Sequence, residues 1–245
     1  MPLTILAVLV AVAPAPALGA QDPPIRVLVV TGGHDFEREP FFGLFRGQAD
    51  IRFEEAAHPG AHARLSPRGA AEYDVIVLYD MWQPITEQAK ADLVALLRQG
   101  KPVVALHHSL ASYNDWPEYA RIIGGRYRLQ AETVDGVQRP ASTYQHDVRF
   151  RVKVADPRHP VTKGISDFDI LDETYGDFDV LPGVKPLLTT DAPTSGRVIA
   201  WVHRYGRSPV VYIQLGHDHH AYENPSYRRL VLQAVRWAAS QSVRR

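Results

Sequence analysis

The sequence contains no cysteine, no excess of either charge and no hydrophobic run long enough to span a bilayer. Without cysteine the protein cannot form disulfides, thiolate nucleophiles or thiolate metal sites. Its 27 basic and 27 acidic side chains cancel, so no strong field attracts nucleic acid or an anionic membrane. We therefore expect a small neutral ligand and no nucleic-acid partner.

The first twenty residues carry no charged side chain and join an apolar run, Leu3 to Ala13, to a stretch rich in Ala and Pro. This pattern is typical of a secretory signal peptide. The run is about half of the ~20 residues needed to cross a bilayer, so we expect no permanent membrane anchor. We predict a signal peptide over residues 1–20, a single domain over residues 21–245 and a periplasmic or secreted location. The alternative is the frayed apolar N-terminus of a cytosolic protein.

The rest of the chain alternates short apolar runs with helical patterns, which is typical of a parallel sheet flanked by helices. Four clear runs predict parallel strands that are neighbours in one sheet: 25–30, 75–79, 103–106 and 210–215. Three weaker runs predict strands nearer the edges: 51–53, 150–154 and 198–202. With 245 residues, 45% of them hydrophobic, the chain can bury one substantial core. The fold class is therefore α/β.

Capping residues mark two helices. Thr86 can cap a helix that Gly100 stops, and Asn224 followed by Pro225 begins the last helix. A shorter helix is expected over residues 116–123. From residue 126 to about 149 the pattern is polar and irregular with a turn signal, Asp135-Gly136, which indicates an insertion or hairpin over one edge.

Six of the eleven histidines follow directly on apolar runs: His34, His107, His108, His217, His219 and His220. Ligands of α/β sheets bind outside the carboxyl ends of the strands, so neighbouring strands would bring these rings together. Imidazole transfers protons near neutral pH and binds divalent metals. One such histidine alone is more often structural, but three strand ends sharing the feature favour a site. The remaining histidines lack this placement and are interpreted as surface or structural: His58, His62, His146, His159 and His203.

Other side chains near the strand ends give weaker indications. Asp35 and Asp218 adjoin histidine clusters. Asp172 and Glu173 lie at the expected start of a loop, where two adjacent acidic side chains are usually exposed to solvent. Several aromatic residues offer faces for sugar rings, although packing is the commoner role: Trp82, Tyr113, Trp116, Tyr175 and Tyr222. Neither dinucleotide-binding nor Walker spacing is present, so no nucleotide cofactor is expected. The G-x-S-x-G motif of serine hydrolases is also absent.

Several segments together resemble the ThuA-like (trehalose-utilisation) family from about Ile25 to Ala238. They are VLVVTGGHDF, YDVIVLYD, GKPVVALHHSL, HPVTKGISDFDILDETY, VIAWVHRYGRSPVVYIQLGHD and NPSYRRLVLQAVRWA. The resemblance implies a flavodoxin-like, class I glutamine amidotransferase-like three-layer sandwich with a mostly parallel central sheet. Those enzymes carry a cysteine on the tight turn after a central strand, where this chain has His107 and His108. Amidotransferase chemistry is therefore not expected.

The resemblance also implies a site and a substrate class. Residues that match the family's motif positions are His34, His107, His108, Glu173, Tyr175 and His217. We assign catalytic roles to His34, His107, His108, Glu173 and His217. We assign substrate binding to Asp35, Trp82, Tyr175, Asp218 and His219. The ligands expected for a divalent metal, zinc or similar, are His34, His107 and His217. The family's name links it to trehalose-like disaccharides and to 3-keto glycosides.

Three functions remain open at this point. A lyase or isomerase would use a His or Glu base on the acidic C–H bonds beside a 3-keto group, and a metal held by two histidines and Glu173 would polarise the carbonyl. A metal-dependent hydrolase would use the same ligands to activate water. A non-catalytic carbohydrate-binding module would seldom need several histidines and an acid at strand ends.

Overall fold

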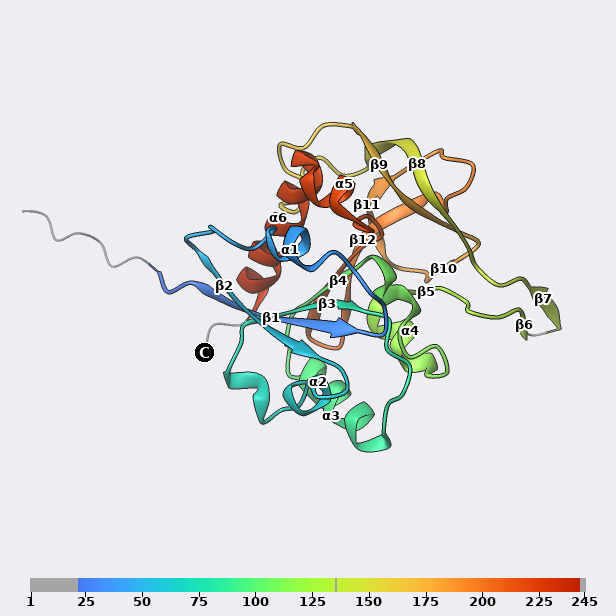
Figure 1. Cartoon of the computed structure of the whole chain (residues 1–245). Helices are drawn as coiled ribbons and strands as arrows, with labels where there is room; N and C mark the ends of the chain where they lie inside the picture. Colours follow the sequence, from blue (N-terminus) through green and yellow to red (C-terminus); the bar gives the residue numbers. More distant parts are fainter. Residues whose placement is uncertain (1–21, 135, 243–245) are drawn as a thin grey trace, which may run out of the picture.

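The computed structural model describes residues 22–134 and 136–242, and its centre is a nine-stranded sheet with the order β2-β1-β3-β4-β13-β12-β11-β8-β9 (Figure 1). The first five strands are parallel: β2 (Ile51–Ala57), β1 (Ile25–Gly32), β3 (Val75–Asp80), β4 (Val103–Leu106) and β13 (Ser208–Ile213). The four strands expected to be parallel neighbours are β1, β3, β4 and β13, so this prediction is confirmed. The weaker run at 51–53 is the edge strand β2, as expected.

The other half of the sheet is antiparallel. It consists of β12 (Val198–Tyr205), β11 (Lys185–Thr189), β8 (Thr143–Val154) and β9 (Phe168–Gly176). The prediction that the run at 198–202 lies near an edge is wrong, because β12 sits between β13 and β11. On one side β12 pairs with the clear run of β13, but its other partner, β11, lies in a segment for which the hydrophobic pattern predicts no strand, so the sequence does not show that β12 is interior.

Helices cover both faces of the sheet and complete three layers (Figure 1). On one face lie α1 (Arg38–Phe42), α5 (His219–Glu223) and α6 (Pro225–Gln241); on the other lie α2 (Ala61–Arg64), α3 (Glu87–Arg98) and α4 (Pro117–Ile123). Short 3-10 turns occupy Gly69–Ala71 and His107–Ala111. Side chains of a strand alternate between faces, so Val27 and Val29 pack with the first set of helices and Leu28 and Val30 with the second.

The predicted helix caps are present. The Thr86 hydroxyl accepts from the N–H of Ala89 at 3.2 Å, and the Asn224 side chain accepts from Ser226 and Tyr227 at 3.0 and 3.2 Å. Each cap satisfies N–H groups that have no partner within the helix, which stabilises the helix by about 1 kcal/mol. None of the helices in the described part of the chain has the length and apolar character that a membrane crossing requires.

The polar segment after α4 is partly a hairpin. β5 (Gly125–Arg126) pairs with β10 (Asp179–Val180), and β6 (Glu132–Val134) pairs with β7 (Val137–Arg139) with Val134 opposite Val137. From Thr143 onward, however, the segment is the exposed first half of β8 in the main sheet. The predicted signal peptide, residues 1–20, lies outside the described residues and stays a prediction.

Candidate functional site

Three histidines from separate strand ends meet at the carboxyl edge of the parallel strands. His34 follows β1, His107 follows β4, and His217 lies four residues beyond the end of β13. The ring centres of His107 and His217 are 5.3 Å apart, and those of His34 and His217 are 6.1 Å apart. Parallel strands end at the same edge of a sheet, which is why these side chains gather there.

The turn that carries His107 is conformationally unusual. His107 has a φ of 48°, in the left-handed region that a non-glycine residue seldom adopts. Its carbonyl oxygen accepts from the Tyr212 hydroxyl at 3.0 Å, and its side chain is fully buried. Strained backbone of this kind concentrates at functional sites, where the surrounding structure holds it in place.

Three ligand atoms converge at the centre of the site. The Nε2 atom of His107 lies 2.9 Å from Oε2 of Glu173 and 3.2 Å from Nδ1 of His217, and that Nδ1 is 3.3 Å from the same carboxylate oxygen. Atoms that share one cation at about 2.0–2.1 Å lie about 3–3.5 Å from one another. This group of His107, Glu173 and His217, called the triad below, therefore has the spacing of a metal site.

The chemistry of the donors agrees with that spacing. Nδ1 of His107 donates to the backbone carbonyl of Gln214 at 2.6 Å, which leaves Nε2 as the ring nitrogen that faces Glu173. Metal-bound histidines typically donate their other N–H in this way. Burial raises the pKa of Glu173, but hydrogen bonds to His107 and His217 outweigh it and hold that pKa well below its usual range. The same hydrogen bond to Glu173 raises the pKa of His217.

Glu173 reaches the triad from a strand, not from a loop as the sequence indicated. Both it and Asp172 lie within β9, where they are 5% and 3% exposed rather than solvated. Asp172 accepts from the N–H groups of Glu173, Gly216 and His217 at 2.8, 2.8 and 3.0 Å. Burial nevertheless raises its pKa. Asp172 thus ties β9 to the loop that presents His217.

Two tyrosine hydroxyls form hydrogen bonds with the backbone of the loop that presents His217. The Tyr79 hydroxyl donates to the carbonyl of Gly216 at 2.8 Å, and the Tyr222 hydroxyl donates to that of His217 at 2.8 Å. Gly216 has a φ of +115°, and a Cβ there would lie 2.1 Å from the Tyr227 hydroxyl. Only glycine therefore fits beside these side chains.

His146 also belongs to the site, although the sequence indicated a surface or structural residue. Its Nδ1 lies 3.3 Å from Oε1 of Glu173, and its ring centre is 4.7 Å from that of His217. In the register of β8 with β9, Gln145 pairs with Thr174 and Val148 with Asp172, so a bulge at His146 faces Glu173. Bulges commonly re-aim side chains beside active sites. No strand-end pattern in the sequence marks this residue.

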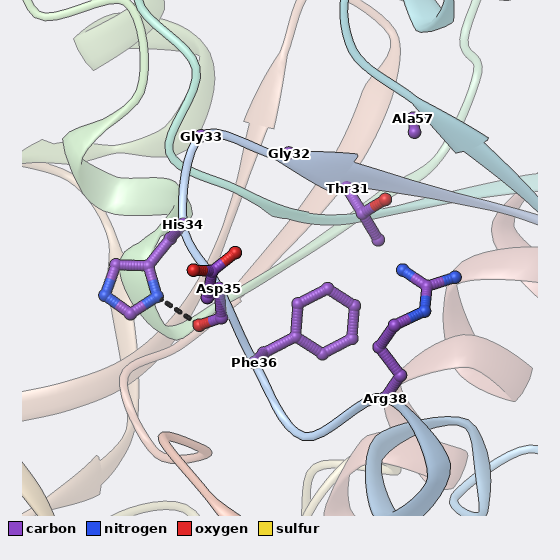
Figure 2. A pocket seen from close by; sticks show the side chains of 8 residues that line it. All are labelled: Thr31, Gly32, Gly33, His34, Asp35, Phe36, Arg38 and Ala57. Atoms are coloured by element: carbon purple, nitrogen blue, oxygen red, sulfur yellow. Dashed lines mark hydrogen bonds between the residues drawn. The ribbon is translucent and has the colours of Figure 1, made fainter.

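His34 and His108 lie beside the triad. Nδ1 of His34 donates to the carbonyl of Asp35 at 2.6 Å (Figure 2). The ring centres of His34 and His108 are 4.7 Å apart, and the two rings are stacked. His34 thus lies near the triad, but its ring nitrogens are not among the three ligand atoms that converge there. Glu173, rather than His34, is the third member of the group expected to bind a metal. Burial lowers the pKa of His108 well below its usual value, and the neighbouring histidines add to the effect.

The expected substrate-binding residues divide into two groups. The Tyr175 hydroxyl lies 2.9 Å from Nε2 of His107, and its ring stacks on the imidazole at 4.9 Å. Asp218 and His219 lie in a neighbouring, more exposed group, where His219 pairs with Glu37 at 2.9 Å. The structure does not bring Trp82 to the triad, because its ring stacks on that of His58 at 5.2 Å. Asp35 lines an open pocket beside the ends of β1 and β2 (Figure 2).

A three-layer sandwich with a histidine on the strained turn after β4 defines a protein of class I glutamine amidotransferase-like fold, with a histidine–glutamate centre and no cysteine. The chain belongs to the ThuA family, described as trehalose utilisation, whose model matches residues 26–238. Family membership supports a carbohydrate-related role. No curated protein matches the chain.

Solved structures agree on the fold. A ThuA-like protein from Parabacteroides merdae has a TM-score of 0.73 at 19% identity, over 91% of this chain and 92% of that one. A second, from Bacteroides uniformis, has a TM-score of 0.67 at 18% identity, over 92% and 95%. A protein described as one component of a GMP synthase, from Thermoplasma acidophilum, has a TM-score of 0.53 at 11% identity, over 90% and 96%. At these identities the likeness shows the fold alone.

Proposed function

We propose that the protein acts on a glycoside or 3-keto sugar by acid–base chemistry at a divalent metal held by His107, Glu173 and His217. The observation that carries the proposal is the convergence of three ligand atoms within 3.3 Å of one another. Two imidazoles and one carboxylate, with a position left for substrate, are typical of catalytic zinc sites. The family description, trehalose utilisation, supports the choice of sugar.

A cation bound by these residues would polarise a substrate carbonyl as a Lewis acid. Two further imidazoles flank the triad. The hydrogen bond from Nδ1 of His34 to Asp35 leaves Nε2 as its basic nitrogen, and His146 contacts Glu173 from the exposed bulge. One ring can remove the proton beside a keto group and the other can return one, as elimination or isomerisation requires. Because burial lowers the pKa of His108, its ring is neutral and adds no charge beside His34.

Metal analysis of the purified protein, followed by incubation with 3-keto-trehalose with and without a chelator, tests the proposal. We expect about one divalent ion per chain and a chelator-sensitive product that is unsaturated or epimerised. Incorporation of oxygen from labelled water at the cleaved bond would instead identify a metal-dependent hydrolase. Tight sugar binding that is insensitive to chelators and gives no turnover would place the protein among non-catalytic binding modules.

A further inference from the structure

A second group of possible metal ligands follows directly on His217. Asp218, His219 and His220 each offer one ligand atom, and the three atoms lie within 4.8 Å of one another. These residues connect the loop after β13 to α5, and they are called the outer cluster below. The reaction proposed above uses none of their side chains, so a role of the outer cluster would be separate from it.

The contacts of the two imidazoles resemble those of metal-bound histidines. Nδ1 of His220 lies 3.2 Å from Oδ2 of Asp218, within the range of about 3–3.5 Å for two atoms that share one cation. Nδ1 of His219 donates to Oε2 of Glu37 at 2.9 Å, which leaves Nε2 as the basic nitrogen of the neutral ring. An outer carboxylate typically orients a metal-binding histidine in this way.

The outer cluster is open to solvent, whereas the triad is largely buried. The side chains of Asp218, His219 and His220 are 27%, 41% and 42% exposed. An ion can therefore reach them without disturbing the core, and small side-chain rotations can bring the three atoms to the closer spacing of a bound cation. Because these rotations order mobile side chains, the ion should bind more weakly here than at the triad.

The charges of the outer cluster favour a cation. Glu37 pairs with His219 and Asp218 with His220, and neither carboxylate has a Lys or Arg partner among the described residues. Arg38, next to Glu37 in the chain, is paired with Glu55 instead. With neutral imidazoles these four side chains carry two negative charges, which a divalent ion would compensate. Imidazole with carboxylate suits zinc, nickel or copper.

The outer cluster also lies between two loops that approach the triad. Glu37 follows His34 at the end of the loop after β1. Its Oε2 accepts from the backbone N–H of His219 at 2.7 Å as well as from the ring. A cation on His219 withdraws electron density from the imidazole and makes its Nδ1–H a stronger donor to Glu37. Metal binding would therefore tighten the link between the loop after β1 and the loop after β13.

We propose that Asp218, His219 and His220 form a second, weaker site for a divalent metal of the zinc type, which joins the loop after β1 to the loop after β13. The inference goes beyond the proposed function, because it requires neither a sugar nor an ion at the triad. A weak site loses its ion during purification and fills again when zinc is added.

Calorimetric titration of the untagged protein with zinc, combined with thermal unfolding, tests the second site. We expect the purified protein and Glu173→Gln, in which the triad is impaired, each to bind about one further ion, and saturating zinc to raise their melting temperatures by a few degrees. His219→Ala and His220→Ala, each made in both proteins, should weaken this binding at least about tenfold. The matched control is His159→Ala, which removes a ring packed on Trp237 outside both groups of ligands.

Equal zinc binding by His219→Ala, His220→Ala and His159→Ala would overturn the second site, as would the absence of binding to Glu173→Gln at about 1 mM zinc. The failures of the two proposed sites are distinguishable. If the unchanged protein binds a single ion in all, its loss in His219→Ala but not in Glu173→Gln would refute the triad as a metal centre. The reverse result would refute the outer cluster.

Discussion

Nδ1 of His107 donates a hydrogen bond to the backbone carbonyl of Gln214 at 2.6 Å. Because a carbonyl only accepts, this contact places a proton on Nδ1 and turns Nε2 toward Glu173 and His217. Gln214 lies directly after β13, the strand beside β4. The pairing of β4 with β13 thus orients the imidazole for the role we propose.

Replacing Glu173 with glutamine should abolish turnover and weaken zinc binding by more than about 100-fold, since outer residues of metal sites already contribute 10–100-fold. The amide keeps the shape of the side chain, so the melting temperature should move by only a few degrees. Zinc titration and thermal unfolding measure both effects. Glu223→Gln, an exposed change on α5, is the control. Unchanged zinc affinity in Glu173→Gln would remove the triad as the metal site.

Replacing Asp172 with asparagine should lower the free energy of unfolding by about 1–3 kcal/mol, because an amide nitrogen replaces one oxygen that accepts buried N–H groups. The loop that presents His217 should loosen as well, with zinc affinity falling about 10–100-fold. Urea unfolding and metal titration provide the measurements. Asp169→Asn, on the same strand and paired with Arg151 at the surface, should change neither. Equal stability of the two variants would contradict the positioning role.

Replacing His146 with alanine should reduce kcat by about 100-fold or more, as expected for loss of a general acid or base. The metal content should remain unchanged because His146 contacts the outer carboxylate oxygen of Glu173 rather than the convergent atoms. Its side chain is 51% exposed, so little stability should be lost. His159→Ala, which removes a ring packed on Trp237, serves as the comparison for kcat. Equal kcat values in the two variants would exclude His146 from the reaction.

Stability should fall as the pH drops from about 7 to 5. Burial lowers the pKa of His203, whose Nε2 donates to the carbonyl of Ile122 at 2.9 Å. A lowered pKa means that the unfolded chain, with a histidine pKa near 6.5, takes up the proton first. The stability associated with the neutral ring is complete above about pH 6.5 and is lost as the pH falls toward the folded value. In His203→Gln, urea midpoints at pH 7 and pH 5 should differ less than in the unchanged protein. An identical difference would assign the pH dependence to other groups.

Local patterns in the sequence were sufficient for the parallel half of the sheet, the capped helices and the gathering of histidines. A buried parallel strand reads as a continuous apolar run, and its end is marked by the polar residues that follow it. His34, His107 and His217 all carry this mark. The convergence of the three strand ends then follows from the parallel arrangement itself.

Tertiary structure alone decided which atoms meet. Glu173 reaches His107 because β9 joins the sheet through antiparallel pairing with β8, and His146 reaches Glu173 because that pairing contains a bulge. Both contacts depend on the register between β8 and β9. A one-residue slip would turn these side chains to the opposite face of the sheet, and hydrophobic periodicity does not encode the register. Side-chain orientation in the folded chain also decides which third group joins His107 and His217. The His34 ring is hydrogen-bonded to the Asp35 carbonyl, whereas the Glu173 carboxylate contacts His107.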